Sequence, residues 1–194
     1  SDKAARHFHL PLQSGSDKIL KAMNRRYDRA KYLDTVAYIR EKMPDIALTT
    51  DIIVGFPGEA EEDFEDTLDI IRRVRYDMIF SFVFSPRRGT PAAEMENQVP
   101  VEIKTQRYLA LVELQNAVSE EINRKFKDSV VRVLCDGPSK TNKSIYSGRT
   151  SGNKIVFFHG EPADIGNFVN VKIERTEAFA LHGEKTDEAP FDKR

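Results

Sequence analysis

The first hundred residues alternate between short apolar runs and segments with helical periodicity, and this alternation constrains the fold more than any other feature. Residues 46–54 and 78–84 are nearly continuous apolar runs of strand length, a pattern typical of strands buried on both faces. Between them, residues 60–75 place apolar side chains at helical spacing, with acidic residues in the first turns and basic residues in the last. Such a strand–helix–strand unit predicts a parallel sheet.

Two further helices and a short strand precede these elements. Residues 7–12 form a strand candidate, and Ser16 is placed to cap a short helix that ends at Met23. A second helix is predicted at about 29–43. Its apolar face would consist of Leu33, Val36, Ala37 and Met43.

A different pattern begins after residue 100. A loop at 86–100 leads into a long helix at about 101–127, whose apolar stripe would consist of Leu111, Leu114, Val118, Ile122 and Phe126. Beyond it come four short apolar runs separated by turn-forming residues, at 130–135, 144–149, 154–158 and 168–175. Strands at this spacing predict a small β-barrel of OB-like size, so the fold class is α/β plus all-β.

These patterns divide the chain into four parts. We assign residues 1–100 to the α/β part, 101–128 to a connecting helix, 129–183 to the β-barrel and 184–194 to a frayed tail. The chain opens on a serine that runs within a few residues into a strand. This start is expected of a fragment of a longer protein, although removal of an initiator methionine explains it as well.

Composition limits the classes of site that this chain can build. With 194 residues and 40% hydrophobic side chains, it can bury a core. Its single cysteine, Cys135, excludes an internal disulfide framework and a self-contained multi-cysteine metal site. The four histidines lack ligand-like spacing, so no metal site is predicted. No apolar run approaches the roughly 20 residues that span a bilayer, so we expect a cytoplasmic protein with no membrane partner.

Two polar turns follow predicted strands at their carboxyl ends, where ligands bind in parallel sheets. Gln13 and Ser14 follow the first strand, and the turn at 55–58 follows the second. Gln13 and Asp51 offer groups suited to ribose hydroxyls, and Arg25 is suited to pair with a carboxylate. A tight strand-to-helix turn, or a phosphate-binding turn, accounts for the glycines of 55–58 equally well. The turn alone therefore leaves the ligand open.

Four motifs in their order along the chain resemble the radical-SAM methylthiotransferase family. They are FHLPLQSGS at 8–16, LKAMNRRY at 20–27, TDIIVGFPGE at 50–59 and SPRRGTPAA at 85–93. The resemblance extends to about residue 183, through a C-terminal TRAM domain. It implies a partial (β/α) radical-SAM barrel, with about the last three strands and their helices, followed by a small OB-like TRAM β-barrel. It also implies S-adenosylmethionine (SAM) as cofactor.

The resemblance further implies roles for single residues around SAM. Gln13 and Asp51 would lie at its ribose, and Arg25, twelve residues after Gln13, would hold its methionyl carboxylate. Arg26 is the competing candidate, and two solvated arginines at a helix end is the simpler alternative. The adenine-side motif of the superfamily implies backbone or packing roles for Ile53, Gly55 and Gly58.

The cysteine motif that holds the family's radical-generating iron–sulfur cluster is absent from this sequence. The resemblance therefore implies [4Fe-4S] clusters only in a longer parent. Predicted partners are its missing N-terminal domain and the N-terminal half of its barrel, or a second fragment joined through the exposed sheet edge. No catalytic residue is assigned, and the chain alone is predicted to be inactive.

The β-barrel is the second candidate surface, because it contains both basic and aromatic residues. Phosphate contacts and base stacking on such a surface are typical of RNA binding. A solvated surface over an aromatic core explains the composition as well, and only the TRAM resemblance implies tRNA as partner. The basic candidates are Lys140, Lys143, Arg149, Lys154, Lys172 and Arg175, and the aromatic ones are Tyr146, Phe157, Phe158 and Phe168.

The family resemblance implies a specific reaction for the parent. A methylthio group would be added to C2 of N6-isopentenyladenosine beside the tRNA anticodon by radical-SAM chemistry. A sister enzyme acting on N6-threonylcarbamoyladenosine in tRNA is one alternative. A non-catalytic RNA-binding module is the other.

Overall fold

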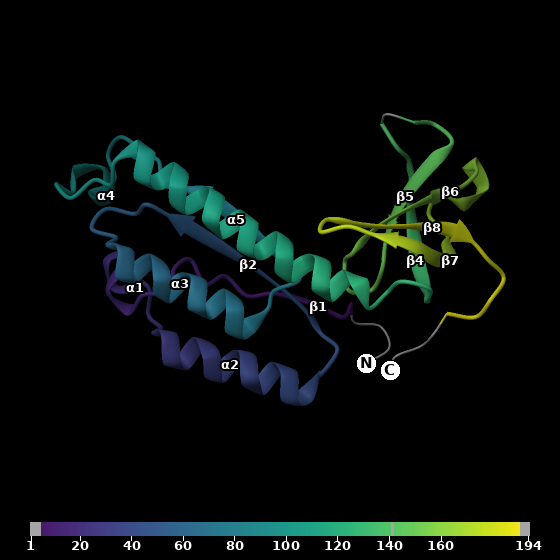
Figure 1. Ribbon diagram of the computed structural model, residues 1–194, viewed down its shortest axis with the longest axis horizontal. Helices are drawn as coiled ribbons and strands as arrows, with labels where there is room; N and C mark the ends of the chain where they lie inside the picture. Colours follow the sequence, from purple (N-terminus) through teal and green to yellow (C-terminus); the bar gives the residue numbers. More distant parts are fainter. Residues whose placement is uncertain (1–4, 141, 191–194) are drawn as a thin grey trace. The chain divides into compact units, whose positions relative to one another are not determined.

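The computed structural model describes residues 5–140 and 142–190, which form two compact units (Figure 1). The α/β unit consists of His9–Pro44 and Leu48–Asn116. Among the described residues, the barrel unit consists of 5–8, Asp45–Ala47, 117–140 and 142–190. Within the barrel unit, Arg6 N donates to Ser151 O at 2.8 Å, which attaches the N-terminal segment. The unit boundary falls inside the long helix, where the sequence predicted a separate connecting segment.

The α/β unit is built on a three-stranded sheet in the order β1-β2-β3. The strands are β1 (His7–His9), β2 (Ala47–Val54) and β3 (Met78–Val83). β2 and β3 are parallel, and the residues after β1 also run parallel to β2, since Gln13 bridges Ile52 in parallel register. The predicted parallel sheet is therefore confirmed.

Helices follow each strand as the sequence predicts, except that a short helix lies within the stretch 86–100, which was predicted to be a loop. They are α1 (Asp17–Ala22), α2 (Arg29–Lys42), α3 (Glu61–Val74), the short α4 (Pro91–Glu94) and α5 (Val101–Arg124). In Figure 1, α1, α2 and α3 lie together to one side of β2. The Ser16 hydroxyl caps α1 and the Asp28 carboxylate caps α2, each accepting a backbone N–H. No helix among the described residues is both long and apolar enough to cross a membrane.

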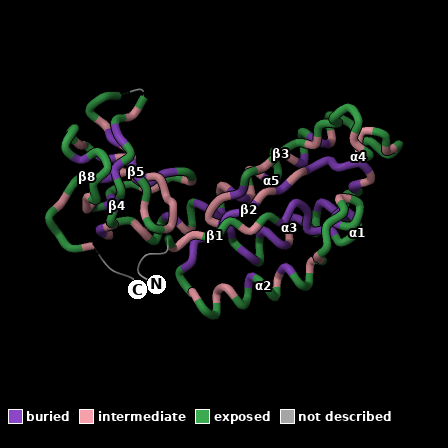
Figure 2. The backbone as a smooth tube through the Cα atoms, turned by 180° about the vertical axis from the view of Figure 1, so that it is seen from behind, coloured by how far each residue is buried: buried purple, intermediate pink, exposed green. Residues whose placement is uncertain are grey.

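The burial of two elements differs from the prediction. β2 is buried along most of its length (Figure 2), but in β3 the side chains of Phe80, Phe82 and Val83 are 45%, 52% and 43% exposed. The prediction that β3 is buried on both faces is wrong, because β3 is an edge strand of the described sheet. In α2 the buried residues are Tyr32 and Val36, and Ala37 is exposed.

The long helix α5 buries polar side chains instead of a continuous apolar stripe. Leu111 and Val118 are buried as predicted, but Leu114 and Ile122 are only half-buried. Each buried polar side chain can lie inside because it finds a hydrogen-bonding partner; for example, Gln115 Nε2 donates to Tyr76 O at 2.8 Å. The buried polar residues of α5 are Lys104, Arg107, Gln115, Ser119 and Asn123.

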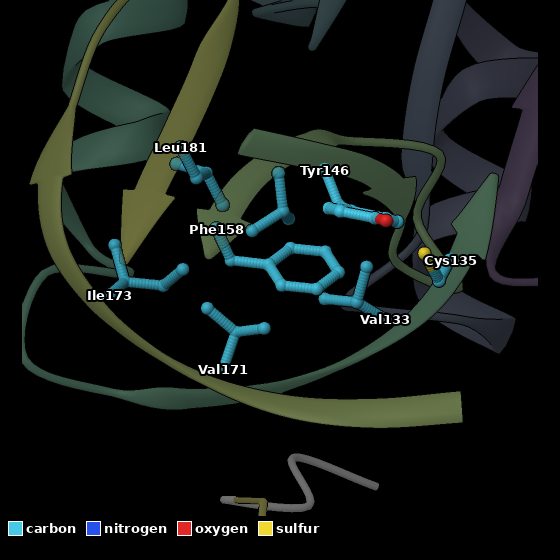
Figure 3. Close-up of a cluster of buried hydrophobic side chains, with 8 residues drawn as sticks. Val133, Cys135, Tyr146, Phe158, Val171, Ile173 and Leu181 are labelled. Atoms are coloured by element: carbon cyan, nitrogen blue, oxygen red, sulfur yellow. The ribbon is translucent and has the colours of Figure 1, made fainter. Parts of the chain in front are cut away.

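The barrel unit contains a closed five-stranded barrel in the order β4-β5-β6-β8-β7, which confirms the OB-like prediction. Neighbouring strands are antiparallel except for β6 and β8, which are parallel. Figure 3 shows its core, where Phe158 lies among apolar side chains from all five strands. Cys135 is a free thiol in this core, and burial raises its pKa. The elements are β4 (Val130–Pro138), β5 (Ile145–Arg149), β6 (Ile155–His159), the 3₁₀ turn η1 (Pro162–Asp164), β7 (Phe168–Thr176) and β8 (Ala180–Lys185).

Sequence analysis missed strand β8, which completes the barrel. Its apolar alternation is interrupted by Gly183, a residue that weakens a strand pattern. Glycine is required there because a Cβ atom would overlap the backbone carbonyl of Lys172 on β7. β8 extends to Lys185, whose Nζ donates to Asp164 Oδ1 at 2.7 Å, so the barrel continues past the predicted limit at 183. The remainder of the predicted tail, 191–194, lies outside the described residues.

Candidate functional site

The turn between β2 and α3 is held by backbone conformations that favour glycine. Gly55 has φ +75° and Gly58 has φ +81°, both in the left-handed region. Gly55 N donates to Glu59 Oε1 at 2.9 Å, and Gly58 N donates to Asn97 O at 2.7 Å. The turn is therefore fixed from inside by a side chain and from outside by the loop that precedes α5.

A buried ion pair anchors this turn to α5. Arg107 Nη1 donates to Glu59 Oε1 at 2.9 Å and to Glu59 O at 3.0 Å, and its Nη2 donates to Glu61 Oε2 at 3.1 Å. The Arg107 and Glu59 side chains are only 7% and 2% exposed. Burial raises the pKa of Glu59, although the Gly55 N–H and Arg107 oppose the shift. The geometry places the guanidinium where it compensates this buried carboxylate.

Lys104 makes a second contact between α5 and the turn. Its aliphatic stem covers Gly55 so closely that a Cβ atom on Gly55 would overlap Lys104 Cγ. Its ammonium group donates to Phe84 O at 3.2 Å. Sequence reasoning missed Lys104 and Arg107 because charged residues on a helix ordinarily face solvent. Their spacing to Leu111 and Val118, at steps of three or four residues, was the available signal.

Gln13 lies in an uncommon backbone conformation. Its φ is +71°, and a left-handed residue other than glycine costs about 1–3 kcal/mol, so surrounding contacts must hold it there. Gln13 N donates to Asp51 O at 2.8 Å, and Ile53 N donates to Gln13 O at 2.9 Å. These bonds place Gln13 directly beside the segment Asp51–Ile53 of β2, as the parallel-strand argument predicts.

The residues after Gln13 are fastened to α3. Gly15 N donates to Thr67 Oγ1 at 2.9 Å, and Ser16 Oγ donates to Asp63 Oδ1 at 2.7 Å. Burial alone would raise the pKa of Asp63, but hydrogen bonds from Lys18, from Ser16 and from a backbone N–H outweigh it and lower the pKa. The two polar turns are thus positioned by the same helix.

Asp51 and Ile53 lie on the open face of the sheet. In the β2–β3 register Asp51 is opposite Phe80 and Ile53 is opposite Phe82. Asp51 is partly exposed, and its Oδ2 lies 3.4 Å from His9 Nε2. The structure therefore brings Asp51, Ile53 and the backbone of Gln13 together at one edge of β2.

Arg25 and Arg26 follow α1 and are both exposed. The next residue, Tyr27, donates its hydroxyl to the carbonyls of Pro11, at 3.1 Å, and Leu12, at 3.0 Å, just before Gln13. Burial raises the pKa of Tyr27, and the charge of Arg25 opposes the shift. The choice of Arg25 over Arg26 as the arginine that binds a carboxylate stays a prediction.

The donor set around β2 fits SAM. A carboxylate and an amide suit ribose hydroxyls, a guanidinium suits the methionyl carboxylate, and glycine backbone can approach a flat ring. The chain does not fit an iron–sulfur cluster, which needs about three or four thiolates. Its one cysteine lies in the barrel core, and no group of three or more metal-ligating side chains occurs among residues 5–140 and 142–190. A pocket of about 250 Å³ lies between Pro57 and Gly58 of the turn and the loop at 95–97.

The barrel carries its basic candidates in different environments. Lys140 and Lys143 are exposed at the loop between β4 and β5, and Arg149 is exposed at the end of β5. Lys154 is half-buried, and its Nζ donates to Asn123 Oδ1 at 2.8 Å, which indicates an anchoring role. Lys172 pairs with Glu188 at 3.2 Å, and Arg175 pairs with Glu177. Arg149 Nε lies 3.9 Å from Asp136 Oδ2, a longer ion pair than that of Lys172. The strongest phosphate-binding candidates by position are therefore Lys140 and Lys143, followed by Arg149.

Two known protein families match separate parts of this chain. Residues 2–71 match the Radical SAM superfamily, and residues 124–186 match the TRAM domain. Among solved structures, coproporphyrinogen III oxidase (HemN) from Escherichia coli, described as a radical SAM enzyme, has a similar fold. The TM-score is 0.50 at 12% identity, over 75% of this chain and 41% of that one. The chain thus combines a partial radical-SAM fold with a TRAM domain.

Curated relatives of this chain point to one family within the radical SAM superfamily. The tRNA-2-methylthio-N(6)-dimethylallyladenosine synthases of Acetivibrio thermocellus, Alkaliphilus oremlandii and Carboxydothermus hydrogenoformans are 54%, 51% and 52% identical to this chain. The matches cover 94%, 96% and 94% of this chain but only 38%, 40% and 42% of those relatives. The resemblance to the radical-SAM methylthiotransferase family is confirmed, and the chain corresponds to part of such a protein.

Proposed function

We propose that this chain is the part of a tRNA methylthiotransferase that completes the SAM site and binds tRNA. The parent would add a methylthio group to C2 of N6-isopentenyladenosine beside the anticodon. The observation that carries this proposal is the succession, in one chain, of a radical-SAM segment and a TRAM domain, at about 50% identity to synthases named for that reaction. The sister reaction on N6-threonylcarbamoyladenosine requires the same two parts and stays the alternative.

The residues of this chain would bind and orient SAM. Gln13 and Asp51 would hold the ribose, and Arg25 the methionyl carboxylate. The turn at 55–58, with Ile53 on the strand before it, would receive the adenine. When bound in the parent, SAM and the iron–sulfur clusters supply the radical and methyl-transfer chemistry. The cluster ligands would come from outside this chain, so the chain alone would be inactive.

The exposed edge strand β3 suggests which other partners this chain would have. The exposed Phe80, Phe82 and Val83 of β3 present apolar surface that a monomeric protein ordinarily covers. We expect the N-terminal domain and half-barrel of the parent to cover it, in the cytoplasm where tRNA is modified. A dimer of this chain through the same edge is the alternative occupant.

Arg25→Ala in the full-length parent should weaken SAM binding about 10- to 100-fold. Loss of a charge-assisted hydrogen bond costs roughly 1.5–3 kcal/mol, and each 1.4 kcal/mol is a factor of ten in affinity. Isothermal titration calorimetry with SAM measures the effect. Arg26→Ala is the matched control and should bind SAM like the wild type. Unchanged affinity in Arg25→Ala together with a large loss in Arg26→Ala would reverse the assignment.

Binding of tRNA to the 194-residue chain should depend steeply on salt. Each neutralised phosphate of a single strand contributes about −0.7 to the slope of log affinity against log salt, so three or four contacts give about −2 to −3. A double Lys143→Ala, Arg149→Ala variant should flatten the slope by about 1–2, whereas Lys31→Ala on α2 should not. Fluorescence anisotropy with tRNA, beside duplex DNA, measures this. Salt-insensitive binding, or equal preference for the DNA, would contradict tRNA recognition by the barrel.

A further inference from the structure

An aromatic ring lies exposed on the outside of the barrel, with a guanidinium group stacked on it. Phe168, the first residue of β7, is 58% exposed. The guanidinium of Arg132, on the neighbouring strand β4, lies over this ring at 4.1 Å from its centroid. Such close stacking holds both flat groups in place at the surface.

The strand register extends this pair into a row. Leu134 on β4 is opposite Phe168 on β7 on one side and opposite Arg149 on β5 on the other. Leu134 is itself exposed, so the row across three neighbouring strands reads cation, apolar side chain, aromatic ring. Directly opposite residues in neighbouring strands lie about 4.5–5.5 Å apart, so these side chains form one continuous patch.

The charge around the patch indicates what it binds. Arg132 forms no ion pair with another residue in 5–140 or 142–190, so no carboxylate in these described ranges neutralises its charge. Arg149 donates to Asn153 Oδ1 at 2.9 Å, and the carboxylate of Asp136 lies 3.9 Å from its Nε. A flat apolar surface flanked by two guanidinium groups suits a ligand that is itself flat and carries negative charge.

We propose that Phe168, stacked with Arg132 and flanked by Leu134 and Arg149, is a platform for an unpaired base of bound RNA. This inference rests on the proposed tRNA binding and goes beyond it by assigning the residues and the chemistry. A base stacked inside a helix has no free face, so the platform selects single-stranded loops. The phosphate beside the stacked base would lie within reach of the guanidinium groups. Arg132 and Leu134 were not recognised from the sequence, although they follow the outward alternation of β4.

The test compares three substitutions of Phe168 and one control substitution, in the 194-residue chain, for binding to an RNA hairpin. Phe168→Ala should weaken binding about 10- to 100-fold, since stacking of one base is worth roughly 1–3 kcal/mol. The salt slope should stay unchanged, because no phosphate contact is removed. Phe168→Tyr keeps the ring and should bind like the wild type, whereas Phe168→Leu should lose affinity like alanine. Phe179→Ala, which removes another exposed aromatic ring, is the matched control and should have no effect.

Each outcome separates the platform from RNA binding itself. Full affinity in Phe168→Leu would overturn the platform, because an apolar side chain would then suffice. Full affinity in Phe168→Ala, with the salt slope still reduced by Lys143→Ala and Arg149→Ala, would overturn the platform and leave the proposed function standing. No RNA binding by the wild-type chain would contradict the proposed function instead. Thermal unfolding of Phe168→Leu checks that the barrel is intact.

Discussion

Arg107→Met should lower the free energy of unfolding of the α/β unit by about 3–5 kcal/mol. Removal of one partner from a buried ion pair leaves the other charge uncompensated, and this is among the largest single-residue effects known. Here the uncompensated group would be the Glu59 carboxylate, which is 2% exposed and also accepts from Gly55 N. Urea denaturation followed by circular dichroism measures the loss.

The pH dependence of this loss identifies its cause. Burial raises the pKa of Glu59 in the folded chain, and removal of Arg107 should raise it further. A group with a raised folded pKa contributes stability below its unfolded pKa and loses it as the pH rises through the folded value. The defect of Arg107→Met should therefore grow from acidic to neutral pH. Glu59→Gln in the same background should recover part of the loss.

Arg26→Met is the control for the ion pair, because it removes an exposed arginine. It should change stability by no more than about 0.5 kcal/mol. If Arg107→Met behaves like this control, the ion pair does not hold the turn and the anchoring described above is wrong.

Gly55→Ala should destabilise the same unit by about 2–5 kcal/mol. The left-handed conformation costs an alanine roughly 1–2 kcal/mol, and forced overpacking against Lys104 adds roughly 1–3 kcal/mol. Gly58→Ala is a matched comparison, because its φ is also positive but no atom lies within 4 Å of the added Cβ. Gly58→Ala should lower the free energy of unfolding only by the conformational part, roughly 1–2 kcal/mol.

A second substitution tests the steric part directly. Lys104→Ala removes the side chain that the new methyl group would meet, so it should reduce the cost of Gly55→Ala toward that of Gly58→Ala. Chemical denaturation of the four variants gives the coupling energy. Equal losses in Gly55→Ala and Gly58→Ala would mean that glycine is needed at 55 for its backbone alone.

Local patterns predicted most of the fold because they depend on few neighbours. The spacing of apolar residues gave the helices α1 to α3 and the strands β2, β3, β5, β6 and β7 to within one residue, whereas β4 extends three residues beyond its predicted end. The cap Ser16 follows from local chemistry. Burial was harder to predict, since it depends on which other part of the protein covers an element. The apolar run of β3 reads as a central strand, yet Phe80 and Phe82 are exposed at the edge of the described sheet.

In the candidate site too, the sequence predicted some neighbours but missed contacts between distant parts of the chain. The parallel-strand argument places Gln13 beside Asp51, and their backbone hydrogen bond agrees with it. The left-handed backbone of Gln13 has no sequence signal, because it results from contacts with β2. Arg107 and Lys104 lie about fifty residues from the turn that they hold, and no local pattern reports such a pairing. The assignment of Gln13, Asp51 and Arg25 to SAM remains a prediction from family resemblance.

The position of Cys135 allows local opening of the barrel to be measured without an engineered cysteine. It is the only cysteine in the sequence, its side chain is 1% exposed, and burial raises the pKa of its thiol. A thiol reagent reacts with the thiolate, so modification requires a strand of the barrel to open first. The rate of labelling under native conditions therefore reports the opening equilibrium of the barrel. Since no second thiol reacts, protection by tRNA could be followed at a single atom.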